Sequence, residues 1–325
     1  MLLLNKDAML QSLTYPQVMD QVEAAYRLFA QGDCYMPERP AFVYQENTYL
    51  YMPCFTKEAV GTKFLTLYPN NPQQGLPYID GLMVLNDPSN GKPLAILDGS
   101  CLTAVRTGAV GGVGMRCFSR SDARSIGVIG AGKQGFYQAI YAVYARPIHD
   151  IWFYDASPKD WESYLAELVT AMGGNQPDFH VATSPEELVA ACDIVVTATP
   201  ATAPVVPDDP NLLRGKCFIC IGSYKPHMRE MPNAIWQLVD NVYTELPFAM
   251  EESGDLSQPL ADGLLTRERV RYIGDLLYAT PQPPLPEKGQ TTYFKSVGMS
   301  LLDLYVAQFI YVAAQRHSLG WNIPF

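Results

Sequence analysis

Apolar positions follow two different spacings along the chain, and the change of spacing separates stretches with different expected structures. Residues 15–31 carry apolar side chains close to helical spacing and stop at Gly32, which predicts an amphipathic helix. Residues 40–100 contain short apolar runs separated by turn sequences such as Asn90-Gly91, which predicts an antiparallel β-meander. Residues 101–118 are small and rich in glycine, so we expect a helix that permits close approach.

From residue 125 onward, short apolar runs alternate with helical segments. The expected strands are 125–129, 151–154, 179–182, 194–198 and 217–221, and the expected helices are one ending near 145, then 159–172 and 184–191. This alternation is typical of parallel βαβ units. The last 30 residues, from about Lys295, are expected to form a helix with Val297 and Leu301 on its apolar side. The middle of the chain is therefore expected to be one domain inserted into another.

Composition and charge narrow the possible function classes. Hydrophobic residues make up 48% of the 325 residues and charged residues 17%, which is typical of a globular protein. The 33 Asp and Glu side chains outnumber the 23 Lys and Arg, and the formal net charge is −10. Binding to nucleic acid or to an anionic membrane requires a surplus of cations, so we expect small-molecule partners instead.

The cysteines and the start of the chain bear on the cellular compartment. The seven cysteines are scattered, and Cys217 and Cys220 lie within one apolar run, which favours buried strand residues over a redox or zinc pair. The chain starts with four apolar residues before charge appears, and no apolar run approaches the ~18 residues of a membrane span. We therefore expect a cytoplasmic protein.

The clearest chemical motif is Gly130-Ala131-Gly132-Lys133-Gln134-Gly135, a G-x-G-x-x-G sequence between a predicted strand and a predicted helix. In this context the first glycine allows a tight turn, the second lets backbone N–H groups reach a pyrophosphate, and the third packs helix on strand. The helix N-terminus favours the negative charge. The motif predicts that these six residues bind a dinucleotide; a tight turn without a ligand is the alternative.

Asp155 ends the next predicted strand. An acidic residue at this position accepts hydrogen bonds from ribose hydroxyls and repels a 2′-phosphate. No arginine follows it, and Lys159 is the nearest cation. NAD is therefore the expected cofactor, with NADP less favoured; a solvated aspartate is the alternative interpretation.

Three cations lie among apolar or small residues: Arg39, Lys63 and Arg106. A cation in such a setting is costly unless it meets an anion, and a guanidinium suits a bidentate grip on a carboxylate. Taken singly, each of the three is more often a surface residue. The four histidines are dispersed without ligand spacing, so no metal site is expected. The acidic group Glu251, Glu252 and Asp255 is interpreted as a solvated or helix-start segment.

A series of short motifs, taken together, resembles the ornithine cyclodeaminase/mu-crystallin family over nearly the whole chain. In order, they are Met36-Pro37-x-Arg39, Tyr51-Met52-Pro53, Lys63 before Pro69-x-Asn71, Gly91-x-Pro93 through Asp98, Leu102-Thr103-x-x-Arg106-Thr107, the glycine motif, Gly222-Ser223, Arg229-Glu230, Glu252 through Leu256, and Phe294-Lys295-Ser296-Val297-Gly298. Each motif is weak alone, and the combination is specific.

The resemblance implies an α/β architecture in which a doubly wound Rossmann NAD-binding domain, residues 121–293, is inserted in an α+β substrate-binding and dimerisation domain made of residues 1–120 and 294–325. It implies a homodimer. It also implies that Arg39, Lys63 and Arg106 surround a substrate carboxylate. Ser296, Val297 and Gly298 would lie near the nicotinamide, and Thr197, Ala198 and Thr199 would line the cofactor.

The sequence departs from the family pattern at two positions. Cyclodeaminases carry an aspartate in a Gly-x-Asp-x-Pro turn, where this chain has Tyr224, and a glutamate where it has Leu50. A cycle of oxidation, ammonia loss and reduction needs a group that exchanges protons near neutral pH. A tyrosine, with a pKa near 10, and a leucine do not supply it readily. Reduction of a ketimine requires only an oriented imine that already carries its proton, and a hydride.

The sequence therefore predicts an NAD(P)H-dependent reductase or dehydrogenase acting on a small cyclic ketimine or an α-imino or amino acid. Lys63 is the expected proton donor, because burial beside two arginines should lower its pKa. Tyr224 is expected at the substrate. Two alternatives remain open: an ornithine cyclodeaminase that uses another acid, with Glu46 or Glu38 suspected first, and a non-catalytic dinucleotide-binding protein.

Overall fold

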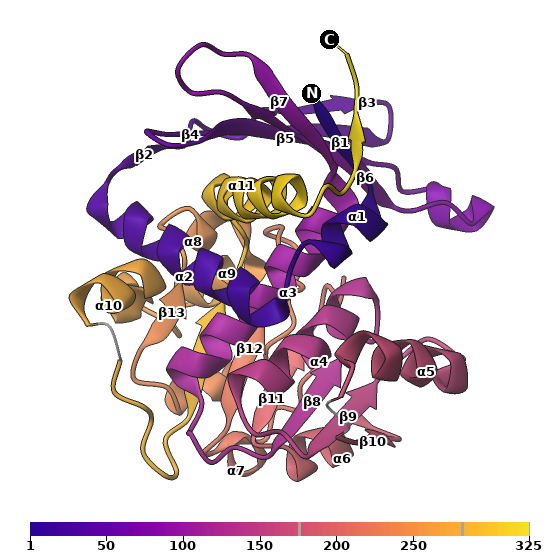
Figure 1. The fold of residues 1–325 in the computed structure, drawn as a ribbon. Helices are drawn as coiled ribbons and strands as arrows, with labels where there is room; N and C mark the ends of the chain where they lie inside the picture. Colours follow the sequence, from indigo (N-terminus) through magenta and orange to yellow (C-terminus); the bar gives the residue numbers. More distant parts are fainter. Residues whose placement is uncertain (175–176, 281–282, 325) are drawn as a thin grey trace. The chain divides into compact units, whose positions relative to one another are not determined.

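The computed structural model describes residues 1–174, 177–280 and 283–324, and it divides the chain into two compact units. Unit 1 consists of Met1–Arg106 and Gly298–Phe325, and unit 2 is Thr107–Val297. Unit 1 is thus built from both ends of the chain, and unit 2 lies between them in the sequence (Figure 1).

Unit 1 contains a mixed sheet in the order β16-β1-β7-β6-β5-β4-β2, with β3 paired to β4. Its strands are β1 (Leu2–Leu4), β2 (Cys34–Tyr35), β3 (Ala41–Tyr44), β4 (Asn47–Thr56), β5 (Val60–Leu67), β6 (Ile79–Asn86), β7 (Pro93–Asp98) and β16 (Trp321–Asn322). The pairs from β3 to β7 are antiparallel, which confirms the predicted meander. At the sheet edge, β1 runs parallel to β7 and antiparallel to β16, which brings the two ends of the chain together.

Helices α1 (Lys6–Gln11), α2 (Tyr15–Gln31) and α11 (Ser300–Arg316) belong to the same unit. The predicted helix 15–31 is confirmed, and it ends at Gly32, whose φ of 76° is the left-handed conformation that glycine adopts without a steric penalty. Helix α11 packs against α2 and against β4, β5 and β6. The sheet turns its alternate residues toward these helices, and along β5 they are Gly61, Lys63, Leu65 and Leu67.

The C-terminal helix starts later than expected. The sequence pattern predicts a start near Lys295, but residues Thr292–Lys295 form a buried strand, β15, and the helix begins at Ser300. Gly298 between them has a φ of 74°, which a right-handed helix cannot contain. The prediction was wrong because the apolar residues Val297 and Leu301 match a helical spacing, although the backbone at Gly298 between them is not helical.

Unit 2 contains a parallel sheet in the order β10-β9-β8-β11-β12-β15-β13-β14. Its strands are β8 (Ser125–Ile129), β9 (Asp150–Tyr154), β10 (Asp178–Val181), β11 (Ile194–Thr197), β12 (Cys217–Cys220), β13 (Val242–Thr244), β14 (Val270–Tyr272) and β15. All pairs in this sheet are parallel. The strands expected between 125 and 221 are confirmed to within one residue at each end, whereas β13, β14 and β15 were not predicted.

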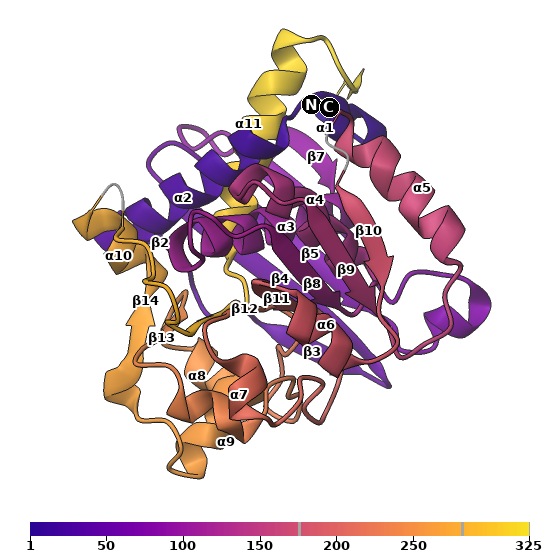
Figure 2. The ribbon, with the colours of Figure 1, turned by 90° about the horizontal axis from the view of Figure 1, so that it is seen from below.

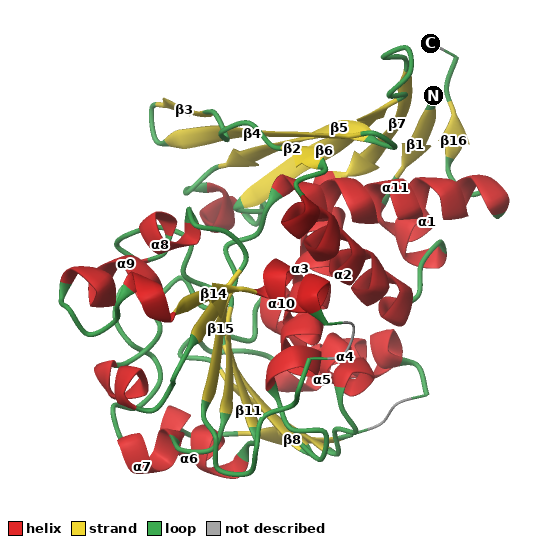
Figure 3. Cartoon of the chain, turned by 90° about the vertical axis from the view of Figure 1, so that its left-hand side faces the viewer, coloured by secondary structure: helices red, strands yellow, loops and turns green. Residues whose placement is uncertain are grey.

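The chain winds outward from β8 in both directions: first through β9 to β10, which lie side by side in Figure 2, and then through β11 to β12. Helices cover both faces of the sheet, with α3 and α4 on one side and α8 and α9 on the other (Figure 3). The helices are α3 (Gly99–Phe118, which begins in unit 1), α4 (Lys133–Ala145), α5 (Trp161–Met172), α6 (Pro185–Ala191), α7 (Pro210–Leu213), α8 (Ala249–Glu252), α9 (Gly254–Ala261) and α10 (Ile273–Ala279). Unit 2 is a doubly wound α/β sheet, and ligands bind such sheets where the winding reverses, at the carboxyl ends of the strands. Here that point lies after β8 and β11.

The remaining expectations concern cysteines, membranes and metals. Cys217 and Cys220 lie buried in β12 as predicted, and burial raises the pKa of both thiols. In the described part of the chain, no helix is both long and apolar enough to span a membrane. The described residues also contain no group of three or more His, Cys, Asp and Glu side chains arranged to hold a metal ion.

Candidate active site

The glycine-rich turn after β8 has the shape that a dinucleotide requires. Gly130 has a φ of 98°, and a Cβ at this position would lie 2.7 Å from the carbonyl oxygen of Ala198. A Cβ on Gly135 would lie 2.1 Å from the carbonyl oxygen of Gly130, so this glycine allows α4 to pack against the turn. At Gly132, by contrast, a Cβ would meet no atom within 4 Å. Gly130 and Gly135 therefore pack closely against the protein, whereas the space next to Gly132 is open. Gly132 is the position at which the backbone must approach a phosphate.

Helix α4 begins immediately after this turn. Gly132 is its N-cap, and no side chain caps its first N–H groups. Uncapped N–H groups and the helix dipole together favour an anion at this end. Among the other residues of the motif, Ala131 is fully buried, Lys133 is exposed, and Gln134 is half-buried.

Asp155 follows β9 directly and is linked to the glycine-rich turn. Its Oδ2 accepts a hydrogen bond from the backbone N–H of Ala131 at 2.8 Å, and its Oδ1 accepts one from the N–H of Ser157 at 2.9 Å. Lys159 lies over the ring of Tyr164, with Nζ 4.6 Å from the ring centroid. Lys159 is thus held by an aromatic face.

A cleft of about 760 Å³ opens beside these residues, within unit 2. It is large enough for a nucleotide cofactor. Its walls are formed by the glycine-rich turn, the end of β9 and the segment after β11: Ile129, Gly130, Gly132, Tyr154 through Lys159, Pro185, Glu186, Ala198 through Ala201, and Pro204 through Pro207. The cleft therefore lies at the winding reversal of the sheet and combines the open glycine of the turn with Asp155. These features fit a dinucleotide.

The Glu230 side chain forms hydrogen bonds with both loops that follow β11 and β12. Its carboxylate accepts hydrogen bonds from the Thr197 hydroxyl at 2.9 Å and from the Thr199 N–H and hydroxyl at 2.7 and 2.8 Å. It also accepts hydrogen bonds from the N–H groups of Gly222 at 2.8 Å and Ser223 at 3.2 Å. Thr197 is itself fully buried, so it contributes to the cleft by holding Glu230, whereas Ala198 and Thr199 line the cleft.

The carboxyl end of β15 is held in a similar way. Glu245, which is fully buried, accepts hydrogen bonds from the Ser296 hydroxyl and the Val297 N–H, both at 2.9 Å. Lys295 Nζ lies 3.2 Å from Asp255 Oδ2 and 4.0 Å from Glu230 Oε2, and all three side chains are fully buried. The interpretation of Asp255 as a solvated or helix-start residue is therefore wrong in part. It does sit in the first turn of α9, but it is the buried partner of a lysine that lies far away in the sequence.

Unit 1 contains a second buried charge cluster. Lys63 on β5 points to the helix side of the sheet, and its Nζ lies 2.8 Å from Asp303 Oδ1 on α11. The same oxygen accepts a hydrogen bond from Arg106 Nε at 2.9 Å. Lys63 and Asp303 are fully buried, and Arg106 is nearly so. A buried lysine and arginine thus share one carboxylate oxygen.

The surroundings of Lys63 lower its pKa to about 7. Burial is the largest cause, since it penalises the charged ammonium. The Asp303 carboxylate opposes this effect, and the positive charges of Arg106 and the half-buried Arg39 add to it. The expected lowering of the pKa is confirmed: burial is its largest cause, and the two arginines add to it.

Gly298 lies against the Arg106 guanidinium. A Cβ at this position would lie 2.6 Å from Arg106 Nη1 and 3.0 Å from Nη2, so a larger residue would displace the end of the arginine side chain. Tyr224 is half-buried in unit 2, in the loop that follows β12. Leu50 packs with the buried Met52, Leu65 and Leu67.

Sequence reasoning missed Asp303, Glu230 and Glu245 as functional candidates. Glu38 and Glu46, the acids suspected first, are both exposed, and Glu46 accepts a hydrogen bond from Asn70. The acid next to Lys63 is Asp303. One signal could have identified it, because Asp303 is a charged residue within an apolar helix, the same criterion that singled out Arg106.

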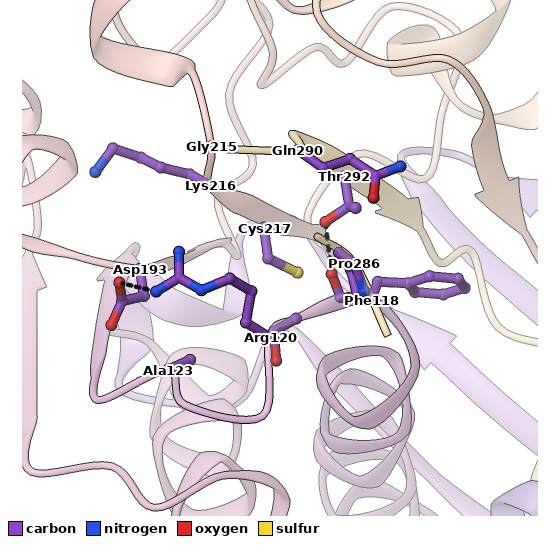
Figure 4. A pocket seen from close by; sticks show the side chains of 11 residues that line it. Phe118, Arg120, Ala123, Asp193, Gly215, Lys216, Cys217, Pro286, Gln290 and Thr292 are labelled. Carbon is purple, nitrogen blue, oxygen red and sulfur yellow. Dashed lines mark hydrogen bonds and ion pairs between the residues drawn. The ribbon is translucent and has the colours of Figure 1, made fainter. Parts of the chain in front are cut away.

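A small recess lies at the opposite edge of the unit 2 sheet (Figure 4). Its volume of about 10 Å³ has room for no more than one water molecule. Arg120 Nη2 and Asp193 Oδ1 point toward each other across it at 3.4 Å, and the Thr292 hydroxyl donates to the Phe118 carbonyl oxygen at 2.6 Å. These contacts join the amino ends of the strands, and the recess has no space for a substrate.

Comparison with known proteins is consistent with this geometry. A model of the ornithine cyclodeaminase/mu-crystallin family matches residues 1–318. This chain belongs to that family. It is 32% identical over 316 residues to a Delta(1)-pyrroline-2-carboxylate reductase from Bacillus cereus, with 95% of each chain covered.

Solved structures of family members have the same fold. The structure of Thermococcus litoralis Delta(1)-pyrroline-2-carboxylate reductase in complex with NADH and L-proline superposes with a TM-score of 0.91 at 28% identity, covering 99% of this chain and 100% of that one. An archaeal alanine dehydrogenase dimer with bound NAD has a TM-score of 0.87 at 27% identity and covers 100% and 99% of the two chains. Unit 2 is therefore a Rossmann-type dinucleotide-binding fold.

Proposed function

We propose that this protein is an NAD(P)H-dependent oxidoreductase that acts on C=N and CH–NH groups and reduces small cyclic ketimines with an α-carboxylate. The observation that carries the proposal is the buried pair of Lys63 and Arg106 around Asp303, in a chain whose other unit has a cleft fit for a dinucleotide. The relatives support this proposal: the Bacillus cereus relative is a pyrroline-2-carboxylate reductase, and the Thermococcus litoralis structure holds NADH and proline.

The cations of unit 1 would bind and protonate the substrate. Arg39, Lys63 and Arg106 would hold its carboxylate, because an anion offsets the cost of burying several positive charges. With a pKa of about 7, Lys63 can release and regain a proton near neutral pH, which suits a proton donor to the ring nitrogen. Tyr224 would lie near the substrate ring. No metal ion takes part in this scheme.

The cofactor would bind to unit 2. The turn from Gly130 through Gly135 would hold the pyrophosphate, and Asp155 the adenosine ribose, which favours NAD over NADP. Thr197, Ala198 and Thr199 would line the cofactor, Thr197 by holding Glu230, and Ser296, Val297 and Gly298 would lie near the nicotinamide. Bound reduced nicotinamide supplies the hydride that adds to the imine carbon. The nitrogen carries or gains one proton, and the product is the cyclic amino acid.

A homodimer is the proposed assembly, and the outer face of the unit 1 sheet supports it. Tyr51, Phe64 and Leu82 lie directly opposite one another on β4, β5 and β6, and the rings of Tyr51 and Phe64 are 4.9 Å apart. Tyr51 is 38% exposed, Leu82 is 46% exposed, and Phe42 beside them is 60% exposed. A contiguous exposed apolar face indicates an interface. A cytoplasmic location remains a proposal that rests on the cysteine pattern of the sequence.

The test is to mix purified protein with NADH, or with NADPH, and pyrroline-2-carboxylate or piperideine-2-carboxylate, and to follow nicotinamide absorbance. We expect oxidation of NADH that depends on the imine. A lack of turnover with both imines and both cofactors would contradict the proposal. Release of ammonia and proline from ornithine with catalytic NAD would identify a cyclodeaminase, and calorimetric cofactor binding without hydride transfer would identify a non-catalytic binding protein.

A further inference from the structure

We propose that Asp303 is a positioning residue of the reductase: it holds the Lys63 ammonium and the Arg106 guanidinium side by side, as a preformed pair that receives the substrate. This inference rests on the proposed function. It adds a residue from α11 to the proposed carboxylate-binding residues on β5 and α3 and in the Arg39 loop.

The geometry carries the proposal. One oxygen, Asp303 Oδ1, lies 2.8 Å from Lys63 Nζ and 2.9 Å from Arg106 Nε. Two cations this close repel each other, and in a buried site the repulsion is only weakly screened. A single shared anion holds them together. Asp303 is itself in the first turn of α11, where the helix dipole favours a negative side chain.

Lys63 and Asp303 can each still form further hydrogen bonds. Lys63 Nζ is in ion-pair contact with Asp303, but it makes no aligned hydrogen bond with any described residue. Asp303 Oδ2 is also buried and makes no hydrogen bond within the described residues. Buried polar groups are normally satisfied, so the vacant capacity of Nζ suits a ligand that accepts hydrogen bonds, as a carboxylate does.

The pKa of Lys63 depends on the charged groups around it, and Asp303 acts against the others. Arg106 on α3 and Arg39 in the loop before β3 both disfavour the ammonium form, and burial disfavours it further. Cys54 on β4 is also near Asp303, and its pKa is raised to about 12, so the thiol stays neutral near pH 7. Asp303 is the one group among these that favours the ammonium form. Its removal should leave Lys63 largely neutral at pH 7.

The experiment compares the pH dependence of kcat/KM in wild-type protein, Asp303→Asn and Asp303→Glu. If protonated Lys63 is required, wild-type activity falls as pH rises through about 7. In Asp303→Asn we expect this falling limb to move about 1–3 units lower, the size of shift that an adjacent opposite charge produces. The KM for the imine should rise as well. Asp303→Glu should keep the limb near pH 7 and raise KM, because the longer side chain moves the cations. Asp33→Asn, which removes an exposed partner of Lys57, should match wild type.

A second readout does not depend on catalysis. In protein labelled with ¹³C at lysine Cε, the signal that disappears in Lys63→Met should titrate near pH 7, and in Asp303→Asn its midpoint should move lower. If the wild type reduces no imine but this shift is seen, the proposed function fails while the Lys63–Asp303 coupling stands. An unchanged midpoint in Asp303→Asn would overturn the positioning role. If Asp303→Asn does not fold, Asp303→Glu provides the test. A variant with the same falling limb of kcat/KM and the same KM as wild type would overturn the positioning role.

Discussion

Lys63 on β5 and Asp303 on α11 form a buried ion pair in which Nζ and Oδ1 are 2.8 Å apart, and Arg106 shares the same oxygen. The pair joins a strand from the first part of the chain to its last helix. Buried ion pairs contribute little net stability, because desolvation costs about as much as the charges return. The net stability of this cluster is therefore small, and the proposed binding of an anionic substrate gives its two cations a separate role.

Lys63→Met should abolish imine reduction while leaving the cofactor site intact. Loss of a positioned proton donor costs roughly 10²- to 10⁴-fold in rate. NADH affinity, measured by fluorescence or calorimetry, should stay within about twofold of wild type, because the glycine-rich turn belongs to unit 2. Lys57→Met is the control, since Lys57 is an exposed lysine of the same unit. Retention of most of the activity in Lys63→Met would refute the assigned role.

The same lysine should make stability depend on pH. Its pKa is lowered from 10.5 to about 7 in the folded protein, so the folded state binds fewer protons than the unfolded state between these values. The contribution of this group to the free energy of unfolding should therefore rise with pH from about 7 to 10.5, by an amount on the order of 5 kcal/mol. Denaturant titrations across this range should show the rise in wild type and a smaller one in Lys63→Met. Identical pH profiles would mean that Lys63 is not buried as a shifted base.

Asp155→Ser should narrow or reverse the preference for NADH over NADPH. A 2′-phosphate carries nearly two negative charges and would meet the Asp155 carboxylate in place of two hydroxyl donors. The lost hydrogen bonds and the repulsion together are worth about 2–4 kcal/mol, or roughly 30- to 1,000-fold in affinity. Dissociation constants for both cofactors, measured by fluorescence, test this. Equal affinity of the wild type for NADPH and NADH would show that Asp155 does not lie at the ribose.

Glu230→Gln should weaken both the fold and cofactor binding. The Glu230 carboxylate accepts from Thr197, Thr199, Gly222 and Ser223, and a glutamine would turn an N–H₂ group toward these donors. Breaking a buried network of this kind costs about 3–5 kcal/mol. Thermal unfolding should show a lower Tm, and NADH titration a higher Kd. In the control Glu187→Gln, where the carboxylate is exposed and caps the start of α6, both changes should be small.

Leu82→Arg should disrupt the proposed homodimer. The side chain lies on the exposed outer face of the unit 1 sheet, next to Phe64 on the neighbouring strand. A charge placed in the core of an apolar interface has no partner there and must be desolvated. Sedimentation or size-exclusion measurements should give a dimer for wild type and a monomer for the variant. A wild-type monomer, or a variant that remains fully dimeric, would show that another surface is used.

The sequence by itself determined the local elements and the cofactor motif. The turn from Gly130 to Gly135 could be recognised because its requirements are local: a positive φ at Gly130, close packing at Gly135 and a helix start at Lys133. Strands β8, β9, β11 and β12 were predicted to within a residue for the same reason, since each is a short apolar run between turn signals. Lys63, Arg106 and Arg39 were singled out as cations among apolar neighbours.

Only the tertiary structure decided which charges meet. Asp303 pairs with Lys63, and Asp255 pairs with Lys295. The partners are far apart in the sequence, so a local sequence pattern could not predict these pairs. The C-terminal helix begins at Ser300 rather than near Lys295 because the left-handed backbone of Gly298 separates it from β15, although Val297 and Leu301 match a helical spacing. Burial sets the pKa of Lys63 and the roles of Glu230 and Glu245, and burial is a property of packed elements rather than of neighbouring residues.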